Sequence, residues 1–260
     1  MKIFTMCMEC QKQFGMPSFE PIVADYYEDS TAYIECSNGH KSYVLLQSQK
    51  FEILLESAAN ALLEGYTIEA ASTFSAAYER FFEFTIKVFC ENYEIKEKSL
   101  KSTFTKVAKQ SERQIGAFLF LYLVTLKEEY KLNEKIPPFR NKVIHKGYIP
   151  TPKEVIEFAE LIYQEIYSIT QILKNSFPNE LQKIITDNIK EKNETIPINI
   201  PRTMSSGTIF FSLSMSEQKS NFKDALSSYK EAREKISGAM PYMKLLNKVV
   251  TFYTNIKSKL

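Results

Sequence analysis

The stretch TIEAASTFSAAYERFFEFTIKVFCENY (67–93) decides the fold class of the chain. Its apolar residues recur at the spacing of an α-helix. The small residues Ala70, Ala71 and Ala77 permit close packing against a neighbouring helix, and the Phe-rich second half can fill a core. We therefore expect a long core helix in a helical protein.

Helical patterns continue on both sides of this stretch. FEILLESAANALLEG (51–65) has a wide apolar stripe that its final glycine can close in a left-handed cap. A basic helix is expected over 98–113, and an apolar helix over about 115–131.

Two further helices follow a proline pair. Pro137-Pro138 fixes a helix start, and this helix is expected to stop at Gly147. TPKEVIEFAELIYQEIYSITQILKN (151–175) opens with a capping box formed by Thr151 and Glu154. The sequence thus predicts a mainly α fold, with an antiparallel helical bundle over 48–176.

The composition of the 260-residue chain is that of an ordinary globular protein, with 44% hydrophobic and 25% charged residues. A net charge of +2 gives no global electrostatic argument for nucleic acid, so any such argument has to be local. No secretory signal is visible, and the longest apolar run, IGAFLFLYLV (115–124), is far shorter than the roughly 20 residues that span a bilayer. We expect a cytoplasmic protein with no membrane partner.

The first 47 residues differ from the rest, and we assign them to a small β module. Short extended pieces such as TAYIEC and KSYVLLQ alternate with turn signals. Cys7 and Cys10 form a C-x2-C pair, and after 25 intervening residues Cys36 and His40 form a C-x3-H pair. Two such pairs supply the four donors of a tetrahedral zinc site, which would leave no open coordination position. We predict a structural zinc in a zinc-ribbon-like module.

Two other interpretations of these residues stay open. In the first, the four residues are unrelated buried residues and His40 lies on a solvated turn. In the second, Cys7 and Cys10 form a redox C-x2-C pair, although the sequence lacks the strand-to-helix setting that such a motif requires. Cys90 lies in an apolar helical context and is expected to be an inert core residue.

The C-terminal third has a weaker pattern. We expect a linker over 177–207 and a mixed extension over 208–260, made of a strand in TIFFSLSM (208–215) and a helix interrupted at Pro241. No internal repeat is visible.

The stretch RNKVIH (140–145) gathers polar groups that can hold and protonate a phosphate. Asn141 and His145 are four residues apart and share a helical face, and Arg140 adjoins Asn141.

This stretch also carries a resemblance. RNKVIHKGY, in a helix after a proline-led turn and before a capped amphipathic helix, resembles the R-x4–6-H motif of HEPN domains. AASTFSAAYERFFEF resembles the second helix of these domains, and the resemblance covers about residues 50–175. HEPN domains are bundles of four to five helices, found in ribonucleases of toxin–antitoxin, abortive-infection and CRISPR systems.

The resemblance implies a metal-independent endoribonuclease whose active cleft forms between two copies of the chain. Arg140 would hold the scissile phosphate, and Asn141 would orient the phosphate or the imidazole. His145 would act as general acid or base for attack by the ribose 2′-OH, giving a 2′,3′-cyclic phosphate. Glu79 would position Arg140 or His145. RNA such as tRNA, and an antitoxin or defence-system protein, would be the partners.

One departure from the family concerns tyrosine. Some HEPN toxins carry R-x4–6-H-x-Tyr, where a partner enzyme modifies the Tyr, but Tyr148 lies one residue late. Silencing by that route is therefore not expected.

Lysines near the motif and in the 94–114 stretch form a candidate RNA-binding surface: Lys142, Lys146, Lys101, Lys106 and Lys109. A solvated helix face explains the same lysines. The alternative functions are a non-catalytic HEPN dimerisation or adaptor protein, and nucleic-acid binding without cleavage.

Overall fold

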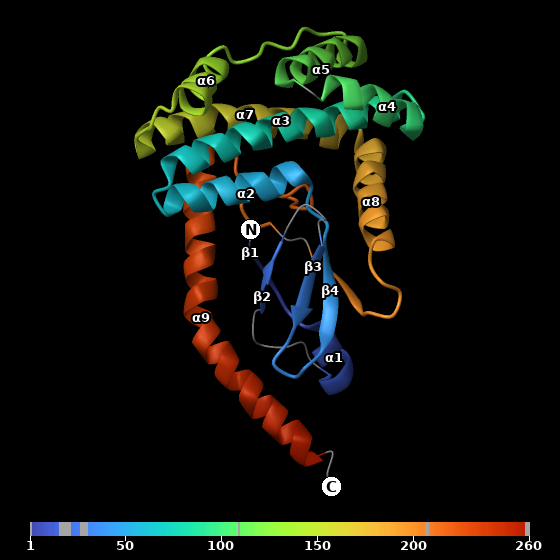
Figure 1. Cartoon of the computed structure of the whole chain (residues 1–260), viewed down its shortest axis with the longest axis vertical. Coiled ribbons are helices and arrows are strands. Elements are labelled where there is room, and N and C mark those ends of the chain that lie inside the picture. The colour runs from blue at the N-terminus through green and yellow to red at the C-terminus, as the bar shows by residue number, and fades with distance from the viewer. Residues whose placement is uncertain (1, 16–21, 27–30, 109, 206–207, 258–260) are drawn as a thin grey trace. The chain divides into compact units, whose positions relative to one another are not determined.

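The computed structural model describes residues 2–15, 22–26, 31–108, 110–205 and 208–257 (Figure 1). The chain forms two compact units, each built from separate segments. One comprises Met1–Ser48, Asp187–Ile209 and Tyr229–Leu260, and the other comprises Gln49–Thr186 and Phe210–Ser228. We call them the β unit and the helical unit. The predicted mainly α fold with a small N-terminal sheet is confirmed.

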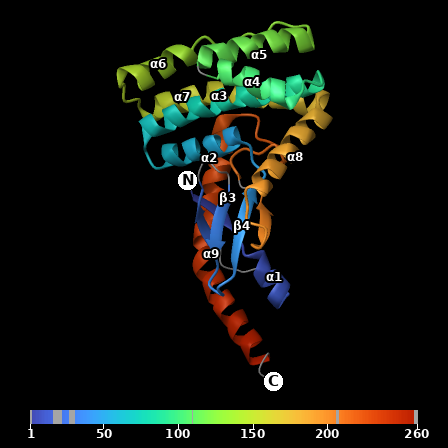
Figure 2. The same cartoon turned by 45° about the vertical axis from the view of Figure 1, so that its right-hand side comes forward.

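The helical unit is organised around one long helix, α3 (Thr67–Asn92). Helix α3 packs against α2 (Lys50–Leu63), α5 (Ser111–Leu126), α6 (Ile136–Lys146) and α7 (Pro152–Ser176). It lies between α2 and α5 in both views (Figures 1 and 2). Its predicted packing residues are buried, both the alanines and the aromatic rings of Phe74, Phe81, Phe82 and Phe89.

The capping box predicted for α7 is present. The backbone N–H of Glu154 donates to the Thr151 hydroxyl, and the Glu154 carboxylate accepts from the Thr151 backbone N–H. The Tyr148 hydroxyl also donates to this carboxylate, at 2.7 Å. These donors lower the pKa of Glu154 to about 2, with the Thr151 N–H as the largest cause.

The basic helix predicted over 98–113 is instead divided in two. Helix α4 (Glu97–Val107) ends before α5 begins at Ser111, and no residue of α4 is buried. The side chain of Gln114, itself buried, donates to the Ala108 carbonyl at 3.3 Å and so satisfies a group at the end of α4. The break therefore lets a buried amide hold the junction between the helices.

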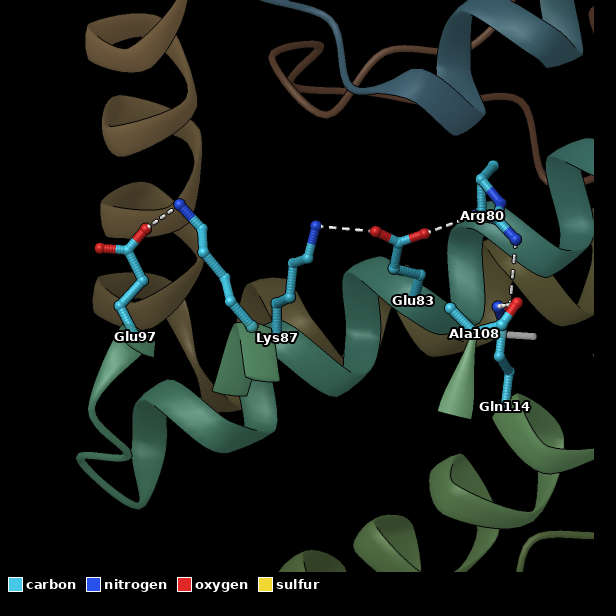
Figure 3. Close-up of polar contacts among 7 residues, drawn as sticks. Arg80, Glu83, Lys87, Glu97, Ala108 and Gln114 are labelled. Carbon is cyan, nitrogen blue, oxygen red and sulfur yellow. Dashed lines mark hydrogen bonds and ion pairs between the residues drawn. The ribbon is translucent and has the colours of Figure 1, made fainter. Parts of the chain in front are cut away.

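A chain of polar contacts attaches this junction to α3 (Figure 3). Glu83 accepts from Lys87 at 2.9 Å and from Arg80 at 2.7 Å, and Arg80 donates in turn to Gln114 at 3.3 Å. Because these groups are only partly exposed, their contacts are screened less than those of surface ion pairs.

The loop between α5 and α6 is held by a partly buried carboxylate on α7. Glu165 accepts from the Asn133 backbone N–H at 2.8 Å, from the Tyr130 hydroxyl at 3.1 Å, and from the Tyr78 hydroxyl. Burial raises the pKa of Glu165, and the three donors oppose this rise. Burial and the nearby charge of Glu165 raise the pKa values of Tyr78 and Tyr130.

The strand predicted over 208–215 is absent, and the prediction was wrong. Residues 208–215 are irregular, although Phe210 and Phe211 are buried. Two buried carboxylates of α2 take the place of a neighbouring strand: Glu56 accepts from the Phe210 N–H at 3.1 Å, and Glu52 accepts from the Leu213 N–H at 2.6 Å. The apolar run is thus a core segment whose backbone is satisfied by side chains.

The β unit contains two small sheets. β1 (Lys2–Thr5) pairs antiparallel with β2 (Ile22–Asp25), and β3 (Thr31–Glu35) pairs antiparallel with β4 (Lys41–Leu46). The strands predicted in TAYIEC and KSYVLLQ are confirmed. A short helix, α1 (Met8–Phe14), follows β1.

The predicted linker over 177–207 is a structured segment. It holds α8 (Pro178–Glu194) and β5 (Arg202–Ser205), which pairs in parallel with β4. Contacts with β4 explain the difference: β5 pairs with it, and Lys192 donates to the Leu46 carbonyl at 2.9 Å. Within the segment, Arg202 donates to the Asn193 side chain at 2.6 Å. The segment therefore gains its structure from contacts that its own polar composition does not reveal.

The last helix, α9 (Phe222–Lys257), contributes residues to both units and runs through Pro241 without the predicted interruption. Within the described residues, no helix combines the length and the apolar character needed to cross a bilayer.

Candidate functional site

The four predicted metal ligands come from two local structures that meet in the β unit. Cys7 precedes the first residue of α1 and Cys10 lies in its first turn, while Cys36 and His40 flank the turn between β3 and β4. That turn is closed by hydrogen bonds from the Gly39 N–H to the Cys36 carbonyl and from the Cys36 N–H to the His40 carbonyl. Gly39 has φ of 79°, a conformation that glycine adopts without strain.

The spacing of the donor atoms fits a tetrahedral cation. The Cys10 and Cys36 sulfurs are 3.8 Å apart, and His40 Nδ1 lies 3.3, 3.6 and 3.8 Å from the sulfurs of Cys10, Cys36 and Cys7. Zinc bonds of about 2.3 Å to sulfur and about 2.0 Å to nitrogen give tetrahedral edges of about 3.8 Å and about 3.5 Å. All four ligand atoms lie within 4.8 Å of one another, so the group could hold a metal ion such as zinc.

The protonation of the thiols bears on the redox alternative. The four cysteines of the chain, all of them described, form no disulfide. Burial, together with the neighbouring Cys36, raises the pKa of Cys10 to about 12 against a lowering by the Asn38 amide, and burial also raises the pKa of Cys7. A reactive redox cysteine needs a lowered pKa, and burial shifts the pKa values of Cys7 and Cys10 in the opposite direction.

Two polar side chains outside the predicted set contact this cluster. Gln13 Oε1 lies 2.5 Å from His40 Nε2, and the Asn38 side-chain N–H donates to the Cys10 sulfur at 3.3 Å. A Gln13 oxygen that accepts from Nε2–H leaves Nδ1 with its lone pair toward the sulfurs, as a metal ligand requires. The spacing of Gln13, one helical turn after Cys10, was the sequence signal for this role.

Cys90 takes no part in the cluster. It is buried in α3, in the helical unit, and burial raises its pKa. This placement agrees with the core role expected for it.

The second candidate site lies on α6 of the helical unit. The two prolines occupy the first turn of this helix, and Gly147 ends it in a left-handed conformation. Val143 is buried against the bundle, so the helix has a fixed orientation, with its remaining faces directed to neighbours or to solvent.

Arg140 is held by its neighbours on three helices. One terminal nitrogen donates to Glu79 of α3 at 2.7 Å and to the Ser111 hydroxyl at 3.3 Å, and the other makes a longer contact with Asn141 at 3.4 Å. The Arg140 and Glu79 side chains are each 22% exposed. Within the described part of the chain, the Arg140 Nε finds no acceptor. Ser111, the first residue of α5, was not predicted, because nothing local marks it as a partner of α6.

His145 lies apart from this group. It is exposed, and it makes no hydrogen bond or ion pair with any residue that the structure describes. Positions 140 and 145 of a helix are separated by about 140° of rotation, whereas positions 141 and 145 share a face. The structure therefore brings together Arg140, Asn141 and Glu79, and leaves His145 on the solvent side with Asn141.

The predicted RNA-binding lysines are on the surface. Lys142 and Lys146 are exposed on α6, with the Lys142 ammonium 3.3 Å from the centroid of the Tyr148 ring. Lys101 pairs with Glu97 at 2.6 Å, and Lys106 is exposed in the last turn of α4. Lys109 lies outside the described residues.

Comparisons of the chain with protein families, with curated proteins and with solved structures found no match.

Proposed function

We propose that the chain is a metal-independent endoribonuclease of the HEPN type, acting as a homodimer in the cytoplasm. The observation that carries the proposal is the arrangement on α6. A guanidinium is held by a carboxylate and a hydroxyl of two other helices, and an exposed imidazole lies just over one turn further along the same helix. The groups that would supply charge stabilisation and proton transfer, the two functions that RNA cleavage needs, thus both lie on one short helix.

In the proposed reaction His145 takes the proton of a ribose 2′-OH, and the oxygen attacks the adjacent phosphorus. The bond from phosphorus to the 5′-oxygen breaks, the leaving oxygen takes a proton, and the products are a 2′,3′-cyclic phosphate and a 5′-hydroxyl. Arg140 offsets the charge that develops on the phosphate oxygens. Glu79 and Ser111 keep the guanidinium in place, and Asn141 orients the phosphate.

The geometry within one copy supports the proposed pairing of two copies. Arg140 and His145 diverge by about 140° around α6, so one copy does not direct both at one phosphate. A two-fold axis beside α6 would place two copies of each residue around a single cleft. The second imidazole would then supply the proton for the leaving oxygen.

The metal cluster has a structural role in this proposal. Cys7, Cys10, Cys36 and His40 would hold one zinc ion with no position left for substrate, and the ion would brace a zinc-ribbon-like module. The lysines on α6 and α4 would contact the RNA backbone, with Lys109 added from the sequence. A role in phage defence or as a toxin, with tRNA as a target and an antitoxin or defence protein as partner, comes from the HEPN resemblance.

A second candidate function is a non-catalytic adaptor or nucleic-acid-binding protein. It is favoured by the contact between Arg140 and Glu79, which by itself explains the arginine as an interhelical ion pair. In that case His145 is an ordinary surface residue.

Cleavage of RNA by the purified full-length protein separates the two functions. Total RNA or tRNA is incubated with EDTA and the products are tested for 2′,3′-cyclic phosphate ends. The wild type should cleave and His145→Ala should lose activity by at least about a hundredfold, the usual contribution of a general acid or base. The matched control is Lys153→Ala, because Lys153 is exposed and lies outside the site.

Full activity of His145→Ala would remove the imidazole from the mechanism. A wild-type protein that binds RNA but leaves it intact, with or without added divalent metal, would establish the adaptor function instead.

A further inference from the structure

The part of α9 that follows Pro241 exposes a row of large apolar side chains. Tyr242 is 73% exposed, Leu245 64%, Leu246 50% and Val249 46%. These positions have the i, i+3, i+4, i+7 spacing of a single helical face. The helix therefore presents an apolar face to solvent, which normally indicates that something covers it.

The charge of the same segment is of one sign. Residues 235–260 contain five lysines and neither Asp nor Glu, whereas the whole chain has a net charge of only +2. The lysines are at positions 235, 244, 248, 257 and 259. The surface that covers the apolar face should therefore be anionic as well as able to take apolar side chains.

An anionic lipid bilayer meets both requirements. An interfacial helix buries its apolar face at the boundary of headgroups and acyl chains, and its lysines are attracted to anionic headgroups. A second copy of the same helix would leave this excess of positive charge without an anionic partner, and RNA would leave the apolar face uncovered. The segment from Pro241 to Lys257 extends for about 25 Å at 1.5 Å per residue, less than the roughly 30 Å of a hydrocarbon core.

We propose that the segment of α9 from Pro241 to Lys257 binds the surface of membranes that contain anionic lipids. Pro241 marks its start, because proline removes one helical hydrogen bond and so permits the segment to change direction there. The inference is independent of the proposed ribonuclease activity. It departs from the expectation of no membrane partner, which rested on the lack of a spanning segment.

Vesicle co-sedimentation of the full-length protein tests this. Vesicles of phosphatidylcholine alone are compared with vesicles of phosphatidylcholine and phosphatidylserine in equal amounts, at low and at high salt. The wild type should sediment with the anionic vesicles, weakly at high salt, and should stay in solution with the neutral ones. Lys244→Gln/Lys248→Gln should weaken binding about 25-fold, since each lysine near an anionic surface contributes about fivefold.

A second variant tests the contribution of the apolar face to vesicle binding. Leu245→Ser/Leu246→Ser/Val249→Ser should weaken binding at least about a hundredfold, because it removes most of the buried apolar area. Lys131→Gln/Lys153→Gln is the matched charge control, and it should bind like the wild type.

Equal binding of the wild type to both kinds of vesicle, or no binding to either, would overturn the proposal. Light scattering after size exclusion identifies the main competing occupant. A wild-type dimer that the triple-serine variant converts to a monomer, without any vesicle binding, would show that a second copy covers the face.

Discussion

The hydrogen-bonded cluster around Glu165 gives a stability prediction that can be worked through in detail. Replacing Glu165 with Ala leaves three donors without their acceptor: the Asn133 backbone N–H and the hydroxyls of Tyr78 and Tyr130. An unsatisfied donor that is shielded from water costs about 1–3 kcal/mol. Because a tyrosine hydroxyl can turn toward water, we take the lower part of this range and expect a loss of about 3 kcal/mol in the free energy of unfolding.

Glu165→Gln is the informative companion variant. Its amide oxygen can accept from the Asn133 N–H while its NH2 group donates to the two hydroxyls, so at neutral pH it should stay within about 1 kcal/mol of the wild type. Glu165 also has a raised pKa in the folded protein, so the folded state binds this proton more tightly than the unfolded state does. The resulting stabilisation is complete below the usual glutamate pKa of about 4.3 and is lost as pH rises through the folded pKa. The Glu165→Gln side chain cannot titrate, so the stability of this variant relative to the wild type should increase as pH rises from about 4.3 through the folded pKa of Glu165.

Urea unfolding followed by circular dichroism, at several values from about pH 4 to about pH 7, measures both effects. The difference between wild type and variant is the relevant quantity, because it cancels the contributions of other carboxyls such as Glu154. A loss below about 1 kcal/mol for Glu165→Ala, or a constant difference between wild type and Glu165→Gln across the pH range, would refute the reasoning.

Three other perturbations test separate parts of the structure. Cys10→Ser should abolish stoichiometric zinc in native mass spectra and lower the melting temperature, whereas the control Cys90→Ser should keep the metal. Zinc retained by Cys10→Ser would contradict the assigned ligand set. Glu52→Ala should cost about 3 kcal/mol or more in urea unfolding, because it leaves the buried backbone N–H groups of Gln49 and Leu213 without an acceptor. A loss below about 1 kcal/mol would mean that the 210–213 segment does not depend on Glu52. A double-mutant cycle of Arg140→Ala and Glu79→Ala should give a coupling energy of about 1–2 kcal/mol for this partly buried pair, and additive losses would show that the contact contributes nothing.

Local chemistry was the part of the fold that could be predicted. The capping box of Thr151 and Glu154 involves groups three residues apart, so α7 and its start could be derived from composition and spacing. The metal ligands could be predicted from the same kind of information, because the two residues of each pair lie in one turn and the two pairs together supply all four ligands of a tetrahedral site. Gln13 and Asn38, which surround the ligands, lie within a few residues of them and were within reach of the same reasoning.

Long-range contacts account for the errors. TIFFSLSM has the composition of a strand, but Glu52 and Glu56, more than 150 positions earlier, accept from two of its backbone N–H groups in place of a neighbouring strand. The strand β5 and the contacts of α8 likewise depend on residues of the N-terminal region. The contact of Arg140 with Ser111 joins two helices through packing, which periodicity alone does not determine.

The parallel pairing of β4 with β5 has a consequence for the order in which the chain becomes structured during synthesis. A ribosome that has completed β3 and β4 has made only part of their sheet, and the strand that pairs with the other edge of β4 is about 155 residues away along the nascent chain. At the roughly 5–20 residues per second of translation, this edge stays open for about 8–30 seconds, during which the helical bundle is already emerging. Expression of the first 48 residues alone would make that temporary exposure permanent, so a fragment intended to isolate the metal cluster needs the 187–209 segment joined to it.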